Sequence, residues 1–192
     1  SATVLLTNGR GGMARLAVDL GRIHSKYDCL LGANLDPRVP VDRHVFVKRA
    51  RVWVDAEGFL SPLDGATLDR FTDGPPASWR FLAPAGDGRA VSIELRIAML
   101  PDRNTTVLAF RRLPDPPSNA TPLPSSAEVR LTVRLDLEDR SFHSQTRRNP
   151  AADQHFTAHC QDLTPAPSSP AAAAKAHENP ATHAGFRFAP AP

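Results

Sequence analysis

A glycine-rich turn near the amino end of the 192-residue chain is the first segment that could do chemistry. Residues 6–12 read Leu-Thr-Asn-Gly-Arg-Gly-Gly, so three glycines fall within four positions directly after a strand-like segment. Glycine tolerates positive φ and lets a ligand or another surface approach the main chain closely. A phosphate cradle would need the Walker lysine and a helix-forming pattern after the turn, and the sequence supplies neither. We interpret the segment as a tight turn that can lie against a second surface.

A set of histidine and cysteine residues near the carboxyl end could bind a metal. His155, His159 and Cys160 are a zinc-compatible group of ligands. We expect residues 155–160 to form a strand, in which positions 155 and 159 share one face and position 160 lies on the other. The three groups then do not converge, so we predict no metal site and no cofactor. The two cysteines, Cys29 and Cys160, are far apart in sequence and are interpreted as reduced thiols.

Three aromatic residues have side chains suited to stacking on a sugar ring: Tyr27, Trp53 and Trp79. A pyranose offers C–H groups to a flat π surface, although tryptophans in a domain of this size are more often core residues. Of the two tryptophans, we favour Trp79 for stacking because it follows a proline-rich turn, whereas Trp53 lies within a long strand. His143, beside Phe142, either faces a substrate groove or a neighbouring domain, or simply ends a half-buried strand.

Alternating apolar and polar residues predict the elements that must position these side chains. Positions 91, 93, 95, 97 and 99 are apolar between mostly polar neighbours, and positions 129–137 repeat the pattern, which is typical of half-buried antiparallel strands. In residues 45–54 the apolar phase slips by one position, which indicates a β-bulge. Weaker strands are expected at 4–7, 16–20, 29–33, 58–61, 79–83, 105–111, 141–145, 155–160 and 185–188. Short strands separated by Gly and Pro turns predict an all-β antiparallel sandwich with minor helix.

Composition bounds the domain organisation and the partners. We expect one β-sandwich domain over residues 1–192, with a flexible Pro/Ala-rich insertion at 164–182 that has little to bury. A net charge of +3 argues against a nucleic-acid partner. No run of about 18 apolar residues and no signal-peptide pattern occur, so we expect no membrane partner and a cytoplasmic location. Because the sequence stops just after a strand-like segment, we expect the chain to be a fragment of a larger enzyme.

Two stretches near the amino end resemble a known family. Residues 5–12 contain Thr-Asn-Gly-Arg-Gly-Gly, and residues 25–31 read Ser-Lys-Tyr-Asp-Cys-Leu-Leu, followed by Ala-Asn-Leu at 33–35. They resemble the N-terminal domain of bacterial and archaeal glycogen-debranching enzymes (amylo-α-1,6-glucosidases), in which a Thr-Asn-Gly-x-Gly-Gly turn precedes a basic-Tyr-His-Gly-Leu-Leu strand. Asp28 replaces the family histidine and Cys29 the glycine, so a sugar contact by that histidine is not carried over. The packing role of Tyr27, in contrast, is carried over.

The resemblance implies a β-supersandwich packed on an (α/α)6 barrel of the same polypeptide, which supplies the acid and base that hydrolyse the α-1,6 branch of glycogen. The residues of this chain are consistent with a non-catalytic part of such an enzyme. An inverting glycosidase needs two carboxylates about 6.5–9.5 Å apart, one of them kept protonated. Glu94 and Asp136 fall on the solvent-facing sides of strands, and the sequence does not indicate that any other two carboxylates form an acid and base pair. We therefore predict no catalytic residue.

These observations lead to a non-catalytic domain that packs on the catalytic helical barrel and helps to shape its substrate cleft. An independent carbohydrate-binding module for α-glucan is the alternative. In either case the residues expected at the substrate or domain interface are Asn8, Gly9, Gly11, Gly12, Lys26, Tyr27, Asp28, Trp79 and His143.

Overall fold

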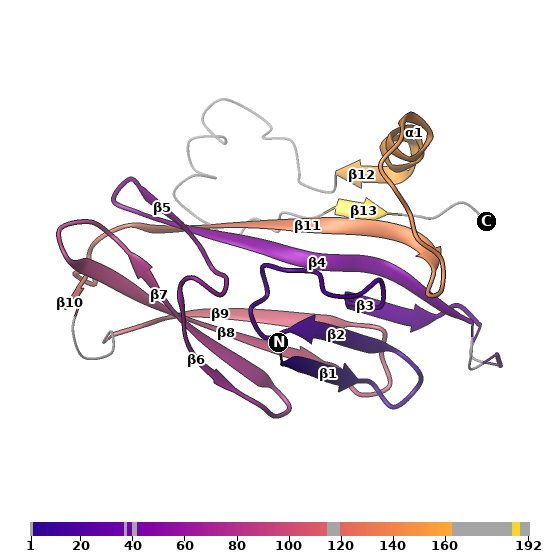
Figure 1. Cartoon of the computed structure of the whole chain (residues 1–192), viewed down its shortest axis with the longest axis horizontal. Coiled ribbons are helices and arrows are strands. Elements are labelled where there is room, and N and C mark those ends of the chain that lie inside the picture. Colours follow the sequence, from indigo (N-terminus) through magenta and orange to yellow (C-terminus); the bar gives the residue numbers. More distant parts are fainter. Residues whose placement is uncertain (1, 37, 40–41, 115–119, 163–185, 189–192) are drawn as a thin grey trace, which may run out of the picture. The chain divides into compact units, whose positions relative to one another are not determined.

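The computed structural model describes residues 2–36, 38–39, 42–114, 120–162 and 186–188. The chain divides into two compact units, residues 1–145 and residues 146–192 (Figure 1). The described elements of the first unit are strands β1 to β11, and those of the second are helix α1 and strands β12 and β13.

The first sheet of the larger unit contains six strands in the order β1-β2-β3-β4-β11, with β5 paired to β4. Every neighbouring pair in it is antiparallel. The strands are β1 (Thr3–Thr7), β2 (Met13–Ala17), β3 (Cys29–Asn34), β4 (Arg43–Ala56), β5 (Phe59–Pro62) and β11 (Val129–Ser141). Strands β4 and β11 are the longest in this sheet, and β5 lies at the opposite end of β4 from β3 (Figure 1).

The second sheet contains five strands in the order β10-β8-β7-β6, with β9 paired to β8. They are β6 (Leu68–Thr72), β7 (Ala77–Pro84), β8 (Arg89–Met99), β9 (Thr106–Leu113) and β10 (Thr121–Pro122). The only parallel pair described in this sheet is the short contact of β10 with β8. The predicted strands at 91–99 and 129–137 are confirmed as β8 and β11, and the predicted all-β sandwich is confirmed with them.

The core lies between the two sheets, where the apolar faces of the alternating strands meet. Its largest fully buried side chains include Trp79 and Phe81 of β7 and Ile93, Leu95 and Ile97 of β8. The indole Nε1–H of Trp79 donates to the main-chain oxygen of Val18, 2.8 Å away, at the end of β2. This hydrogen bond joins the second sheet to the first through the middle of the core.

Strand β4 contains the bulge that the sequence indicates. Val47 is opposite Leu137 and Arg49 is opposite Asp136, so Lys48 is an extra residue on β4 between two consecutive residues of β11. An inserted residue resets the alternation. As a result Val45 and Val47 point inward before the bulge, and Ala50, Val52 and Val54 point inward after it.

The smaller unit corrects one predicted strand. Residues 155–160 do not form a strand, because α1 (Pro150–His159) occupies almost all of them. Asn149 caps this helix by accepting from the main-chain N–H of Ala152 at 2.9 Å, and Pro150 takes the first turn, where a missing N–H costs nothing. Strand β12 (Cys160–Asp162) follows and pairs with β13 (Phe186–Phe188). The proposed insertion at 164–182 lies outside the described residues.

Both cysteines are free, Cys29 buried and Cys160 exposed. No helix in the described part of the chain is both long and apolar enough to cross a membrane.

Candidate functional site

The glycine-rich turn connects β1 to β2, and its asparagine is used for structure. Asn8 is 4% exposed, and its Oδ1 accepts from the main-chain N–H groups of Arg10 and Gly12 at 2.8 and 2.9 Å. Its Nδ2 donates to the main-chain oxygen of Arg103 at 3.0 Å and to Oδ1 of Asn104 at 2.8 Å. The side chain therefore fixes the turn to the loop that follows β8, and its hydrogen-bonding groups are occupied.

The glycines of this turn are required by its geometry. Gly9 and Gly11 have φ values of +79° and +85°, in the left-handed region. A Cβ on Gly12 would lie 2.7 Å from Oδ1 of Asn104 and would collide with the side chain of Asn8. These residues hold the turn closed, which is a positioning role.

Asp28 also has an internal role. It is 3% exposed, and its carboxylate pairs with the guanidinium of Arg15. The other carboxylate oxygen accepts from the main-chain N–H groups of His24 and Ser25 at 2.7 and 2.9 Å. Asp28 thus closes the turn that leads into β3.

An aromatic platform, which we define as Tyr27, Phe142 and His143 with Lys26, forms where the loop before β3 meets the end of β11. The ring centroids of Tyr27 and Phe142 are 4.8 Å apart, and those of Phe142 and His143 are 5.6 Å apart in an edge-on arrangement. The hydroxyl of Tyr27 lies 3.4 Å from Nδ1 of His143. The ammonium of Lys26 lies 5.1 Å from the centre of the Tyr27 ring and donates to the main-chain oxygen of His143 at 2.9 Å.

Two cations beneath the platform hold its two segments together. Arg140, 6% exposed, pairs with Glu138 and donates to the main-chain oxygens of Lys26 at 2.7 Å and Ser144 at 2.8 Å. Lys48, the bulge residue of β4, donates to the oxygens of Ser25 and Lys26 at 3.2 and 2.8 Å. Burial lowers the pKa of Lys48, with Glu138 opposing that effect. The main chain on both sides of the platform is therefore held by buried or partly buried cations.

A small hydrophobic cluster connects the platform to the glycine-rich turn. Met13, which directly follows the turn, packs with Cys29 and Val45, and Phe142 packs against this cluster. The guanidinium of Arg43 lies 5.3 Å from the centre of the Phe142 ring. Burial raises the pKa of the Cys29 thiol, so Cys29 behaves as a small apolar residue here.

The structure brings together only some of the predicted site residues. Lys26, Tyr27 and His143 lie in one group, and Asp28 supports them from below. The turn containing Asn8 contacts a different loop. Trp79 is a correction: it is 0% exposed in the core and cannot stack on a sugar, because both faces of its ring are covered by protein.

Sequence reasoning missed the residues beneath the platform. Arg140 points inward because β11 carries an extra residue between Leu137 and Arg140, opposite the segment from Val47 to Val45. Without that irregularity, period two would place position 139 inward and position 140 in solvent. No residue type in the sequence marks this second irregularity.

The carboxylates on the outer faces are committed to arginines. Glu94 pairs with Arg96 and Arg111, and although burial opposes it, these two partners hold the pKa of Glu94 below its ordinary value. Asp136 pairs with Arg49 and Arg51 at 2.7 and 2.6 Å. Burial raises the pKa of Asp136, but the two guanidinium groups outweigh that effect and lower it. Carboxylates kept ionised in this way cannot serve as the protonated acid of glycoside hydrolysis. Among the described residues, no three His, Cys, Asp or Glu side chains could hold a metal ion.

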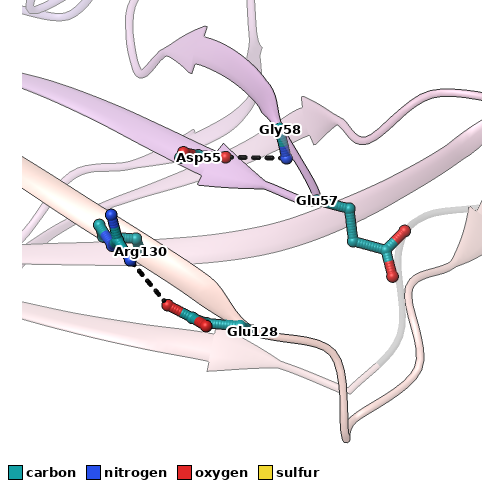
Figure 2. A pocket seen from close by; sticks show the side chains of 5 residues that line it. All are labelled: Asp55, Glu57, Gly58, Glu128 and Arg130. Carbon is teal, nitrogen blue, oxygen red and sulfur yellow. Dashed lines mark hydrogen bonds and ion pairs between the residues drawn. The ribbon is translucent and has the colours of Figure 1, made fainter.

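An open pocket of about 200 Å³ lies at the other end of β4, lined by Asp55, Glu57, Gly58, Glu128 and Arg130 (Figure 2). Oδ1 of Asp55 accepts from the main-chain N–H of Gly58 at 3.0 Å, and Arg130 pairs with Glu128 at 3.1 Å. Glu57 turns away from these groups in Figure 2, and its carboxylate pairs with Arg89 at 2.6 Å. Sequence reasoning did not single out this pocket, because its residues come from the β4–β5 turn and the start of β11.

Fold and site together define an all-β sandwich domain with a preorganised aromatic platform and ion-paired outer carboxylates. The family model described as glycogen debranching enzyme N terminal matches residues 3–190, so the chain belongs to this family. No curated protein and no solved structure matches the sequence. The resemblance noted in the first 35 residues is confirmed over nearly the whole chain.

Proposed function

We propose that this domain packs through its aromatic platform on a helical catalytic domain of the same polypeptide and helps to shape the cleft that receives branched α-glucan. The observation that carries the proposal is the platform itself, in which the rings of Tyr27, Phe142 and His143 lie together. The buried Arg140 and Lys48 both donate to the main-chain oxygen of Lys26, next to Tyr27. Aromatic side chains beside a cation are typical of the energetically important part of an interface. A platform already rigid in the free domain loses little conformational entropy on docking.

The domain has a supporting role in this proposal, and the chemistry belongs to its partner. Membership of the debranching-enzyme family supports the assignment to a glucan-processing polypeptide. The ion pairs of Glu94 and Asp136 argue against an acid and base within this sandwich. Release of glucose from a branched dextrin by the purified 192-residue chain would contradict this division of roles.

The test is made in the full-length polypeptide. His143 is exposed and Tyr27 partly buried, so we expect Tyr27→Ala with His143→Ala to lower the thermal stability of the full-length protein and to raise KM for a branched dextrin, by about tenfold for a central aromatic contact. The control is Val107→Ala, which removes a 40% exposed apolar side chain from β9 of the second sheet and should change neither quantity.

The same double variant in the 192-residue chain separates docking from folding. If the chain unfolds as before while the full-length protein is affected, the platform acts between domains. A full-length double variant with wild-type KM and melting temperature would refute the proposal.

A further inference from the structure

Trp53 occupies an unusual position on the outer face of the first sheet. It lies in β4 between Pro62 of β5 and Thr132 of β11, both of which are exposed, and it is itself partly exposed. Its neighbours Val52 and Val54 point into the core. A tryptophan facing outward on a sheet adds less to the core than an inward one, so its presence there calls for another explanation.

The two tryptophans also differ in the hydrogen bonding of their indole N–H groups. In Trp79 this group is used inside the core, where it donates to Val18. Within the part of the chain that the structure describes, Trp53 has no hydrogen-bond acceptor for its Nε1–H and no aromatic ring stacked on it. Trp53 therefore keeps both a ring face and a donor for something outside the sandwich.

The pocket in Figure 2 adjoins this tryptophan. Asp55 follows Trp53 by two residues, so the two side chains lie on the same face of β4, about 7 Å apart along the strand. Asp55 is opposite Arg130 in the register of β4 with β11, and Leu60 of β5, 66% exposed, is opposite Asp55 on the other side. The pocket lining itself is polar, with the carboxylates of Asp55, Glu57 and Glu128 and the guanidinium of Arg130 (Figure 2). The apolar side chains of Trp53 and Leu60 belong to neighbouring positions of β4 and β5.

Each of the polar groups retains capacity for a ligand. Oδ1 of Asp55 accepts a hydrogen bond from the main-chain N–H of Gly58, and one carboxylate oxygen of Glu128 accepts from one guanidinium nitrogen of Arg130. An ionised carboxylate has about four acceptor sites, and a guanidinium has five N–H donors. The volume of about 200 Å³ is below the roughly 300–1,000 Å³ of sites for drug-sized molecules, which suits a single ring of a longer chain.

We propose that the outer face of the first sheet binds a saccharide chain. Trp53 stacks on one pyranose ring, and Asp55, Glu128 and Arg130 form hydrogen bonds with the hydroxyl groups of a neighbouring ring. A flat π surface meets the C–H face of the sugar, and the mixed acceptors and donors meet its hydroxyls. Because the chain belongs to the debranching-enzyme family, α-linked glucan is the saccharide to test.

This site is independent of the proposed docking platform. Trp53 is nine residues along β4 from His44, near which the platform lies, and nine residues of strand span about 30 Å. A failure at one end of β4 therefore does not imply a failure at the other, and variants at the two ends can be compared directly.

The experiment is native gel electrophoresis of the 192-residue chain in gels with and without glycogen. We expect glycogen to retard the wild-type chain, Trp53→Ala to weaken the retardation about tenfold, and Glu128→Gln with Arg130→Gln to weaken it as well. Val107→Ala, which removes a 40% exposed apolar side chain from β9 of the other sheet, is the control and should be retarded like the wild type. A thermal melt of each variant confirms that it is folded.

Fluorescence gives a second readout that does not depend on an alanine variant. The chain has two tryptophans, one fully buried and one partly exposed. Maltoheptaose should change the solvent-exposed component of the emission in the wild type and leave Trp53→Phe, in which Trp79 alone emits, unchanged. Migration of the wild type unaffected by glycogen, or retardation of Trp53→Ala equal to that of the wild type, would overturn the inference.

Discussion

The buried carboxylate of Asp28 stabilises a turn of the main chain. Asp28 satisfies two main-chain N–H groups and one guanidinium while remaining almost fully buried. A carboxylate in that position closes the turn before β3, and the turn in turn presents Tyr27. The carboxylate of Asp28 is therefore fully used inside the domain.

Asp28→Ala should destabilise the domain by about 3 kcal/mol, because hydrogen bonds to a buried charged group are lost together. Urea unfolding of the 192-residue chain measures the change. Asp36→Ala is the control, since Asp36 makes similar contacts with Arg38 but in solvent, and its unfolding midpoint should match that of the wild type. Equal midpoints for both variants would show that the turn does not depend on Asp28.

Gly9 and Gly11 provide a matched pair in the turn between β1 and β2. Both have positive φ, but a Cβ on Gly9 meets nothing within 4 Å, whereas one on Gly11 overlaps the side chain of Asn34. Gly9→Ala should cost about 1 kcal/mol of unfolding free energy from backbone strain, and Gly11→Ala about 1–3 kcal/mol more from overpacking. Denaturant titration of the two variants side by side tests this order, and the reverse order would contradict it.

At the residue scale, sequence reasoning favoured Trp79 over Trp53 for stacking on a sugar, whereas Trp79 is fully buried and Trp53 partly exposed. Both Trp53 and Trp79 sit in alternating segments. Which face of a strand turns inward depends on the sheet that covers it, and an alternating pattern alone does not say this for a single bulky residue. Trp79 lies at an inward position of β7, and Trp53 at an outward position of β4.

At the element scale, regular alternation was the most reliable signal. β8 and β11 were predicted because five apolar residues alternate in each, and β4 was predicted with its bulge because the phase slip is visible in its apolar residues. The helix α1 was missed, although Asn149 followed by Pro150 is a helix-start signal.

The ion pairs between β4 and β11 predict a dependence of stability on pH. Since the pKa of Asp136 is lower in the folded protein than in the unfolded chain, the unfolded chain binds more protons as the solution becomes acidic. The stabilisation from Asp136 is therefore complete above its ordinary value of 3.8 and is lost as the pH falls through the lowered folded value.

Asp136→Asn should be less stable than the wild type by about 1 kcal/mol at pH 7, and the difference should disappear well below pH 3.8. Urea midpoints of both proteins at several pH values measure the gap. The pKa of Glu94 is also lowered, so both proteins lose stability in acid, and comparing them isolates Asp136. A gap that stays constant to low pH would mean that the carboxylate does not stabilise β4 against β11 through its charge.

At the scale of the whole molecule, the larger unit contains its own core. Every buried residue among those described lies before position 146, and helix α1 buries no residue. The resemblance at the amino end pointed to the family that the match over residues 3–190 shows, whereas the division at 145 left no clear mark in the sequence. Compact units that hold a complete core commonly fold independently.

A shortened chain that ends at Gln145 should therefore unfold cooperatively, with nearly the same urea midpoint and slope as the 192-residue chain. Equilibrium unfolding followed by fluorescence is suitable, because both tryptophans lie in this unit. A loss of cooperativity, or a clear drop in the midpoint, would show that residues 146–192 contribute to the core.

The extra residue at Lys48 has a consequence for how this strand can change during evolution. Deleting one residue elsewhere in β4 would turn every following side chain to the wrong side of the sheet. At position 48 a deletion would instead restore an unbroken alternation, while removing the ammonium group that ties down the loop at Ser25 and Lys26. Related sequences should therefore tolerate a one-residue gap at this point of the strand more readily than at any other, and those that have it should hold the loop before β3 by a different side chain.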